Sequence, residues 1–132
     1  MNFLIDTNIC SAYIKGHREV WNKFLQHSGG IAISAVTAGE LWAWVSRKQA
    51  TDKSRVVVTE FIESVDVLEV DLTVALCFGK LRGELLDMGI TIPNLDGLIA
   101  ATALSHDLTL VTNNTADFKN VPDLRLQDWT VG

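Results

Sequence analysis

The chain has 132 residues, of which 48% are hydrophobic and 20% charged, and its formal net charge at pH 7 is −5. This composition excludes an intrinsically disordered protein and suits a single domain over residues 1–132. The negative charge argues against a protein that holds nucleic acid on a broad basic surface, but not against an enzyme that binds phosphate through a metal ion. No apolar run approaches the length of a membrane span.

The N-terminus and the cysteines lead to an expectation about the cellular compartment. The N-terminus lacks the basic region followed by an apolar region that indicates a secretory signal. Cys10 and Cys77 have no Cys-x-x-Cys partner and do not indicate a zinc site. We therefore expect a cytoplasmic protein with two reduced thiols.

Short apolar runs alternate with helical patterns along the chain. The predicted strands are residues 3–5, 31–33, 67–70, 108–111 and 124–126. The predicted helices are residues 7–14, 20–28, 34–48, 53–64, 71–88 and 93–106, with a short helix near 117–118. Strands that alternate with helices predict a parallel sheet covered by helices on both faces.

Four acidic residues fall where a predicted element begins or ends. Asp6 directly follows the first strand, and Asp117 follows the fourth strand and a Thr-Asn-Asn loop. Glu40 and Asp96 lie in the first turns of two helices. Because the carboxyl ends of parallel strands share one edge, where open α/β sheets bind ligands, we predict that the four side chains meet in one crevice.

Each acid also has an explanation that needs no function. Asp6 suits the N-cap of a helix, and Asp96 suits the first turn of one, where the helix dipole favours an acid. Glu40 completes the pattern Thr-x-x-Glu of a capping box with Thr37. Asp117 lies in a polar loop, where solvated acids are common. The sequence alone leaves these alternatives open.

If the four carboxylates do converge, their mutual repulsion requires compensation. Two carboxylates about 4 Å apart repel by roughly 4 kcal/mol at an effective dielectric constant of 20. Either some of them hold protons or a divalent cation lies among them. A ligand set made of oxygen atoms suits Mg²⁺ or Mn²⁺ rather than zinc, and the three histidines, His17, His27 and His106, fit no metal-ligand spacing. Such a site favours phosphoryl chemistry.

Four motifs occur in order along nearly the whole chain: FLIDTNI at 3–9, ISAVTAGEL at 33–41, DGLIAATAL at 96–104 and LVTNNTADF at 110–118. Together they resemble the PIN-domain ribonucleases, and within them the VapC-type toxins of type II toxin–antitoxin pairs. The resemblance implies a PIN-like three-layer α/β fold with a central, mainly parallel sheet. It also implies endonucleolytic cleavage of RNA that depends on Mg²⁺ or Mn²⁺.

The same resemblance assigns roles to individual residues. It implies that Asp6 and Asp96 are the principal metal ligands and that Glu40 and Asp117 complete the site, directly or through water. Four polar neighbours of these acids are expected to support the site: Thr7, Asn8, Thr112 and Asn113.

The resemblance further implies a homodimer that a small antitoxin of the VapB type neutralises by inserting a C-terminal segment into the cleft. Trp42 and Trp44 lie close to the second motif, and an exposed tryptophan there would suit a contact with the dimer partner or the antitoxin. The alternative is that both tryptophans belong to the core. The candidate contacts with the RNA substrate are Arg47, Lys48, Lys53 and Arg55.

Two other classes of function were compared with the nuclease. In phosphatases of the haloacid-dehalogenase type an Asp after the first strand is the nucleophile, and a second acid follows two residues later. Asn8 occupies that position here, which counts against this class. A non-catalytic binding module on the same fold has no need to retain all four acids, so their presence counts against this class too.

Overall fold

The structure is a computed structural model, and it describes residues 2–131. Within these residues the strands are β1 (Phe3–Ile5), β2 (Ile31–Ser34), β3 (Asp66–Leu68), β4 (Thr109–Val111) and β5 (Leu126–Gln127). The helices are α1 (Thr7–Ile14), α2 (Arg18–Gln26), α3 (Ala35–Val45), α4 (Asp52–Ser64), α5 (Leu72–Asp87), α6 (Asn94–Ser105) and α7 (Thr115–Phe118). None of these helices is both long enough and apolar enough to cross a membrane.

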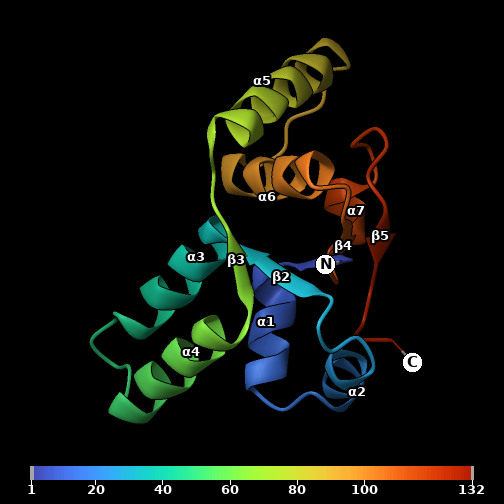
Figure 1. Ribbon diagram of the computed structural model, residues 1–132. Helices are drawn as coiled ribbons and strands as arrows, with labels where there is room; N and C mark the ends of the chain where they lie inside the picture. Colours follow the sequence, from blue (N-terminus) through green and yellow to red (C-terminus); the bar gives the residue numbers. More distant parts are fainter. Residues whose placement is uncertain (1, 132) are drawn as a thin grey trace.

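The five strands form one sheet in the order β3-β2-β1-β4-β5, and every pairing is parallel (Figure 1). Phe3 of β1 pairs with Ile31 on one side and with Thr109 on the other, so β1 is the central strand. All three residues of β1 are buried, as the apolar run FLI predicts for a strand covered on both faces.

Alternate residues of the strands point into two separate cores. Phe3 and Ile5 pack with side chains of α1, α2, α3 and α4, whereas Leu4 packs with side chains of α5, α6 and α7. Figure 1 shows these helices on the two sides of the sheet, with α5 outermost. The predicted three-layer arrangement is therefore confirmed.

Polar side chains fix the beginnings of five helices. Each accepts a hydrogen bond from a backbone N–H of the first turn, which otherwise has no partner. The capping residues are Asp6 for α1, His17 for α2, Ser34 for α3, Thr51 for α4 and Asp71 for α5. Because Ser34 caps α3, the capping box proposed from Thr37 and Glu40 does not form, and Glu40 lies inside the helix instead.

The C-terminal half of α3 differs from the sequence prediction. The helix ends at Val45 rather than at residue 48, and the hydroxyl of Ser46 donates to the carbonyl of Trp42 at 2.7 Å. Trp42 and Trp44 are 48% and 40% exposed, so the alternative that both belong to the core is wrong. Helical periodicity shows which residues share a face, but a neighbouring element is needed to bury that face.

Candidate active site

Asp6 lies at the carboxyl end of the central strand and is 5% exposed. Its backbone N–H donates to the carbonyl of Val111 at 3.0 Å, which ties it to β4. Its side chain caps α1 by accepting the N–H of Ile9 at 2.9 Å. The capping role inferred from the sequence is therefore real, and it holds the carboxylate at the edge of the sheet where the other acids lie.

The surroundings of Asp6 raise the pKa of its carboxyl group above the ordinary value. The largest cause is burial, and the charges of Asp96 and Glu40 act in the same direction, against hydrogen bonds with Thr112 and Ile9. Burial also raises the pKa of Asp96, with Glu40 and Asp117 adding to the effect. Each of the four acids therefore lies close enough to another for their charges to interact.

The hydroxyl of Thr7 connects the first motif to the second. It donates to Glu40 Oε1 at 2.6 Å and lies 3.2 Å from Thr37 Oγ1. Thr7 begins α1 and Glu40 lies in α3, so this bond joins two helices that follow neighbouring strands. It restricts the orientation of the Glu40 carboxylate, which is only partly buried.

Asp96 lies in the first turn of α6 and is partly buried. The next residue, Gly97, lies against the ring of Phe78 in α5, and a Cβ atom there would be 2.8 Å from Phe78 Cε1. The absence of a side chain at Gly97 lets α6 pack closely on α5. This close packing fixes the start of α6, and with it the position of Asp96.

Asp117 is exposed in α7 and connects back to Asp6 through the loop after β4. The side-chain amide of Asn114 donates to Asp117 Oδ2, and the backbone N–H of Asn114 donates to Thr112 Oγ1 at 3.0 Å. Thr112 is buried, and its side chain acts on the Asp6 carboxyl group, whose pKa it lowers. The bonds that hold this loop are made by Asn114, which the sequence analysis did not name. An asparagine at a helix start, three residues before an acid, is the sequence signal that could have identified Asn114.

Asn8 and Asn113, the other two polar neighbours named from the sequence, are exposed. Both line a hollow of about 520 Å³ that follows the outer face of α1. The structure thus places both asparagines on the surface, next to the outer face of α1.

The donor chemistry of the four acids fits a hard divalent cation. All the candidate donors are carboxylate oxygens, and a bound cation would relieve the mutual repulsion that adds to burial in raising the pKa of Asp6 and Asp96. Among residues 2–131, no three His, Cys, Asp or Glu side chains form a preassembled metal cage. Mg²⁺ does not require such a cage, since it keeps several waters and binds through one or two carboxylates.

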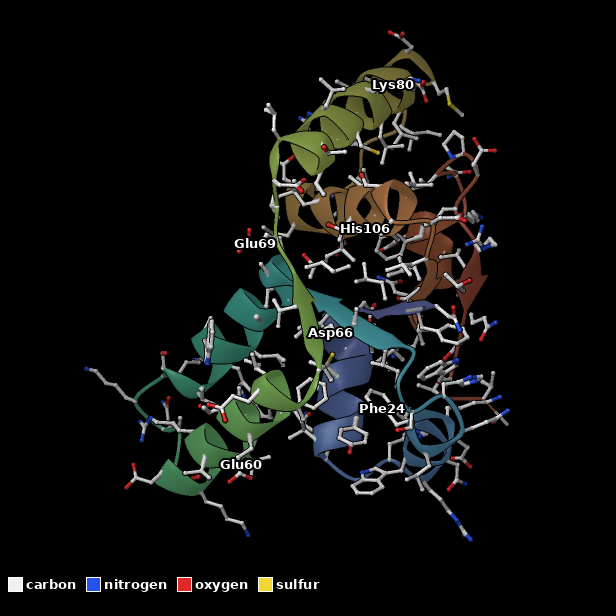
Figure 2. All side chains as sticks on the ribbon, in the orientation of Figure 1. Phe24, Glu60, Asp66, Glu69, Lys80 and His106 are labelled. Atoms are coloured by element: carbon white, nitrogen blue, oxygen red, sulfur yellow. The ribbon has the colours of Figure 1, made fainter. Side chains whose placement is uncertain are left out.

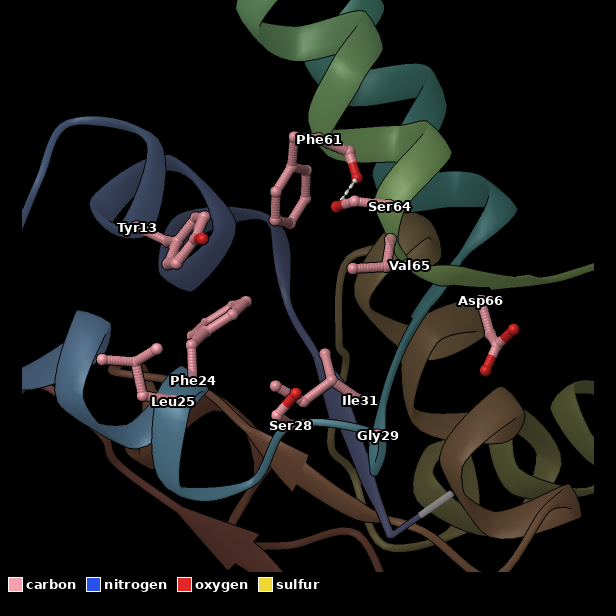
Figure 3. A pocket seen from close by; sticks show the side chains of 10 residues that line it. All are labelled: Tyr13, Phe24, Leu25, Ser28, Gly29, Ile31, Phe61, Ser64, Val65 and Asp66. Atoms are coloured by element: carbon pink, nitrogen blue, oxygen red, sulfur yellow. Dashed lines mark hydrogen bonds between the residues drawn. The ribbon is translucent and has the colours of Figure 1, made fainter.

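The opposite edge of the sheet offers no comparable chemistry. A hollow of about 280 Å³ lies at the amino ends of β2 and β3, lined by the rings of Tyr13, Phe24 and Phe61 (Figure 3). Figure 2 shows Phe24 on α2 and Asp66 on β3. Asp66 is the only carboxylate that lines this hollow, so it holds no group of acids that could bind a cation.

The chain was compared with known proteins. The model of the PIN domain matches residues 3–124. The tRNA(fMet)-specific endonuclease VapC of Shigella flexneri is 36% identical over 131 residues, which cover 98% of this chain and 99% of that protein. Ribonuclease VapC2 of Rickettsia felis is 33% identical over 132 residues, which cover 98% of each chain.

Solved structures agree with these sequence relatives. The DNA-bound VapBC complex from Salmonella typhimurium contains a chain with a TM-score of 0.93 and 32% identity, with 98% of each chain covered. The VapBC2 complex from Rickettsia felis, bound to a DNA fragment from its promoter, gives a TM-score of 0.90 at 32% identity, with 98% of this chain and 99% of that chain covered. Nucleases with a PIN domain generally depend on a divalent metal ion. This chain belongs to the PIN-domain family and, within it, to the VapC ribonucleases.

Proposed function

We propose that this protein is the toxin of a type II toxin–antitoxin pair, an endoribonuclease that hydrolyses RNA phosphodiester bonds with Mg²⁺ or Mn²⁺. The observation that carries the proposal is the electrostatic coupling of four carboxylates at the carboxyl edge of the sheet. It occurs in a chain whose full-length relatives are named ribonucleases. The protein would act in the cytoplasm.

In this proposal Asp6 and Asp96 hold the metal ion, and Glu40 and Asp117 complete the site directly or through water. A bound divalent ion offsets the charge of the phosphodiester, lowers the pKa of a bound water and stabilises the leaving oxygen. The protein supplies position: the fold keeps Asp6 away from bulk water, and Thr7 orients Glu40. Both effects reduce the reorganisation that the reaction requires.

The proposed partners are RNA, a small antitoxin of the VapB type and a second copy of the chain. The similar solved structures are VapBC complexes, which supports the antitoxin. Leu72 and Leu76 lie one turn apart on α5 and are 84% and 75% exposed, an apolar surface that suits a contact between copies. Initiator tRNA is the first RNA to test, because it appears in the name of the Shigella relative.

The decisive experiment is induced expression of the wild type beside Asp6→Asn, with total RNA sequenced for new 5′ ends. We expect new ends only with the wild type, because Asn keeps the helix cap but removes the charge that binds the ion. The same pattern of ends from Asp6→Asn would contradict the proposal. A phospho-aspartate at Asp6 would instead indicate a phosphatase, and tight antitoxin binding without any cleavage would indicate a binding module.

A further inference from the structure

An exposed tryptophan lies close to the acids on the surface of α3. Trp44 follows Glu40 by four residues, so the two lie on the same face of the helix, about 6 Å apart along its axis. Its side chain lines two hollows, of about 450 Å³ and about 210 Å³, near the connection between α3 and α4. An accessible aromatic ring is thus available one helical turn from the proposed cleavage site.

Cationic side chains surround this ring. Lys15 Nζ lies 5.3 Å from the centre of the Trp44 ring, Arg47 lines the larger hollow and Lys53 lines the smaller one. With Lys48 on the same connection, these residues make up what we call the Lys15–Trp44 patch: Lys15, Trp44, Arg47, Lys48 and Lys53. Within residues 2–131, none of its four cations forms an ion pair.

Arg55, the fourth basic residue named from the sequence, has a different role. Its guanidinium pairs with Asp52 at 2.7 Å, and its Nε donates to the carbonyl of Val45 at 3.2 Å. These contacts join the end of α3 to the beginning of α4. Arg55 therefore holds the connection that carries the patch, and Asp52, the acid nearest to the patch in sequence, is already neutralised.

Polar groups lead from the acids to the patch. Asn8, Ser11 and Lys15 follow one another along the outer face of α1, and all three line the hollow that Asn113 also lines. Asn8 is two residues after Asp6, at the active-site end of α1, and Lys15 is at the opposite end. Amide and hydroxyl groups thus connect the two regions.

We propose that the Lys15–Trp44 patch binds the single-stranded RNA that flanks the scissile phosphodiester, an inference that rests on the proposed function. A base stacks on Trp44 while Lys15 and its neighbouring cations pair with phosphates, the combination by which proteins bind single strands. The groups along α1 lie where the ribose passes and offer hydrogen bonds to its 2′-hydroxyl. Unpaired cations in a chain of net charge −5 favour a polyanion over an apolar protein partner at this surface.

The test measures binding of a fluorescently labelled initiator tRNA transcript to the full chain by anisotropy, in EDTA, over a range of salt concentrations. We expect Trp44→Ala and Lys15→Gln each to weaken binding roughly tenfold, and Trp44→Phe to retain most of it, since Phe keeps a stacking face. In a plot of the logarithm of the association constant against the logarithm of the salt concentration, Lys15→Gln should also make the negative slope less steep by about 0.7 to 0.9. The reason is that one phosphate contact is lost. A purely structural role for Lys15 would not change this slope.

The chain offers matched controls for both substitutions. Trp42→Ala removes a tryptophan of similar exposure two residues away on α3, and Lys23→Gln removes a lysine on α2. Both should bind like the wild type.

Three outcomes would overturn the proposal. The first two are that the wild type does not bind RNA, or that the control variants lose as much affinity as Trp44→Ala and Lys15→Gln. The third is that Trp44→Ala binds RNA normally but elutes as a smaller species in size-exclusion chromatography, which would assign Trp44 to a contact between copies. If RNA binds through the patch but no RNA is cut with Mg²⁺, the proposed function fails and the patch stands.

Discussion

Two clusters of side chains in this molecule have opposite effects on its stability. The aromatic cluster lies on the face of the sheet that α1 and α2 cover. It consists of Phe3, Tyr13, Phe24, His27, Phe61 and Trp129, and the ring centres of its contacting pairs are 4.1 to 6.3 Å apart. The carboxylate cluster, at the carboxyl edge of the sheet, crowds like charges in a partly buried place. The first buries apolar area, and the second disfavours its own ionised state. The unfavourable crowding of these charges persists only because the packing of the rest of the fold offsets its energetic cost.

The largest effect is expected from neutralising an acid of the carboxylate cluster. Asp96→Asn should lower RNA cleavage by about 1,000-fold or more, because a group that acts on the transition state is lost. The same change should raise the melting temperature of the metal-free protein, since it removes a repelling charge. Cleavage assays with Mg²⁺ and calorimetry in EDTA measure both. A variant that cuts normally would end the assignment of Asp96.

The opposite result is expected in the aromatic cluster. Trp129 is 1% exposed and packs edge-on against Phe3 and Phe24, so Trp129→Ala should cost about 3–5 kcal/mol of the free energy of unfolding. The activity of the molecules that remain folded should change little, because the cluster does not contact the acids. Urea unfolding followed by active-site titration separates the two quantities. If instead stability holds and activity falls, the distinction between the clusters is wrong.

A smaller effect is expected at the bond between Thr7 and Glu40. Thr7→Val keeps the shape of the side chain but removes the hydroxyl that donates to Glu40 at 2.6 Å. We expect cleavage to fall about 10- to 100-fold, the usual cost of losing a group that orients a metal-site carboxylate. Thr7→Ser, which keeps the donor, is the matched control. Equal activity of the Val and Ser variants would show that orientation of Glu40 by this bond is unimportant.

The smallest effect is the dependence of stability on pH. Since the pKa values of Asp6 and Asp96 are raised in the folded state, the folded protein binds more protons than the unfolded chain. The contribution of these two groups to stability is therefore present at low pH and is lost as pH rises through their folded-state pKa values. Melting temperatures in EDTA should rise modestly as pH is lowered from neutrality, and this trend should be weaker in Asp96→Asn.

With Mg²⁺ present, the trend in the same pH range should reverse. The ion binds ionised carboxylates, so the stability that it adds is lost as pH falls. Identical pH profiles in EDTA and in Mg²⁺ would mean that the acids do not hold the ion.

Several features were predictable from local sequence. The apolar run of β1, the cap at Asp6 and a helix over residues 53–64 are each expected from the sequence, and each is present. The β-branched run at 56–59 by itself favours a strand, yet α4 is helical and buries Val58, Phe61 and Ile62. The buried face decided the conformation, because packing outweighs intrinsic propensity.

Other features depended on contacts between distant parts of the chain. The link from Thr7 to Glu40 spans 33 residues, and the close approach of Gly97 to Phe78 brings two helices together. Leu25 is 69% exposed, although the periodicity of α2 places it with the buried Val20 and Phe24.

The sequence by itself determined the strand–helix alternation, the helix starts and the family, because these depend on residue types at short spacings. The tertiary structure alone decided the order of the strands, the neighbours of each acid and the exposed side of Trp44. Those relations join residues far apart in the chain, and only the packing of the two cores against the sheet brings them together.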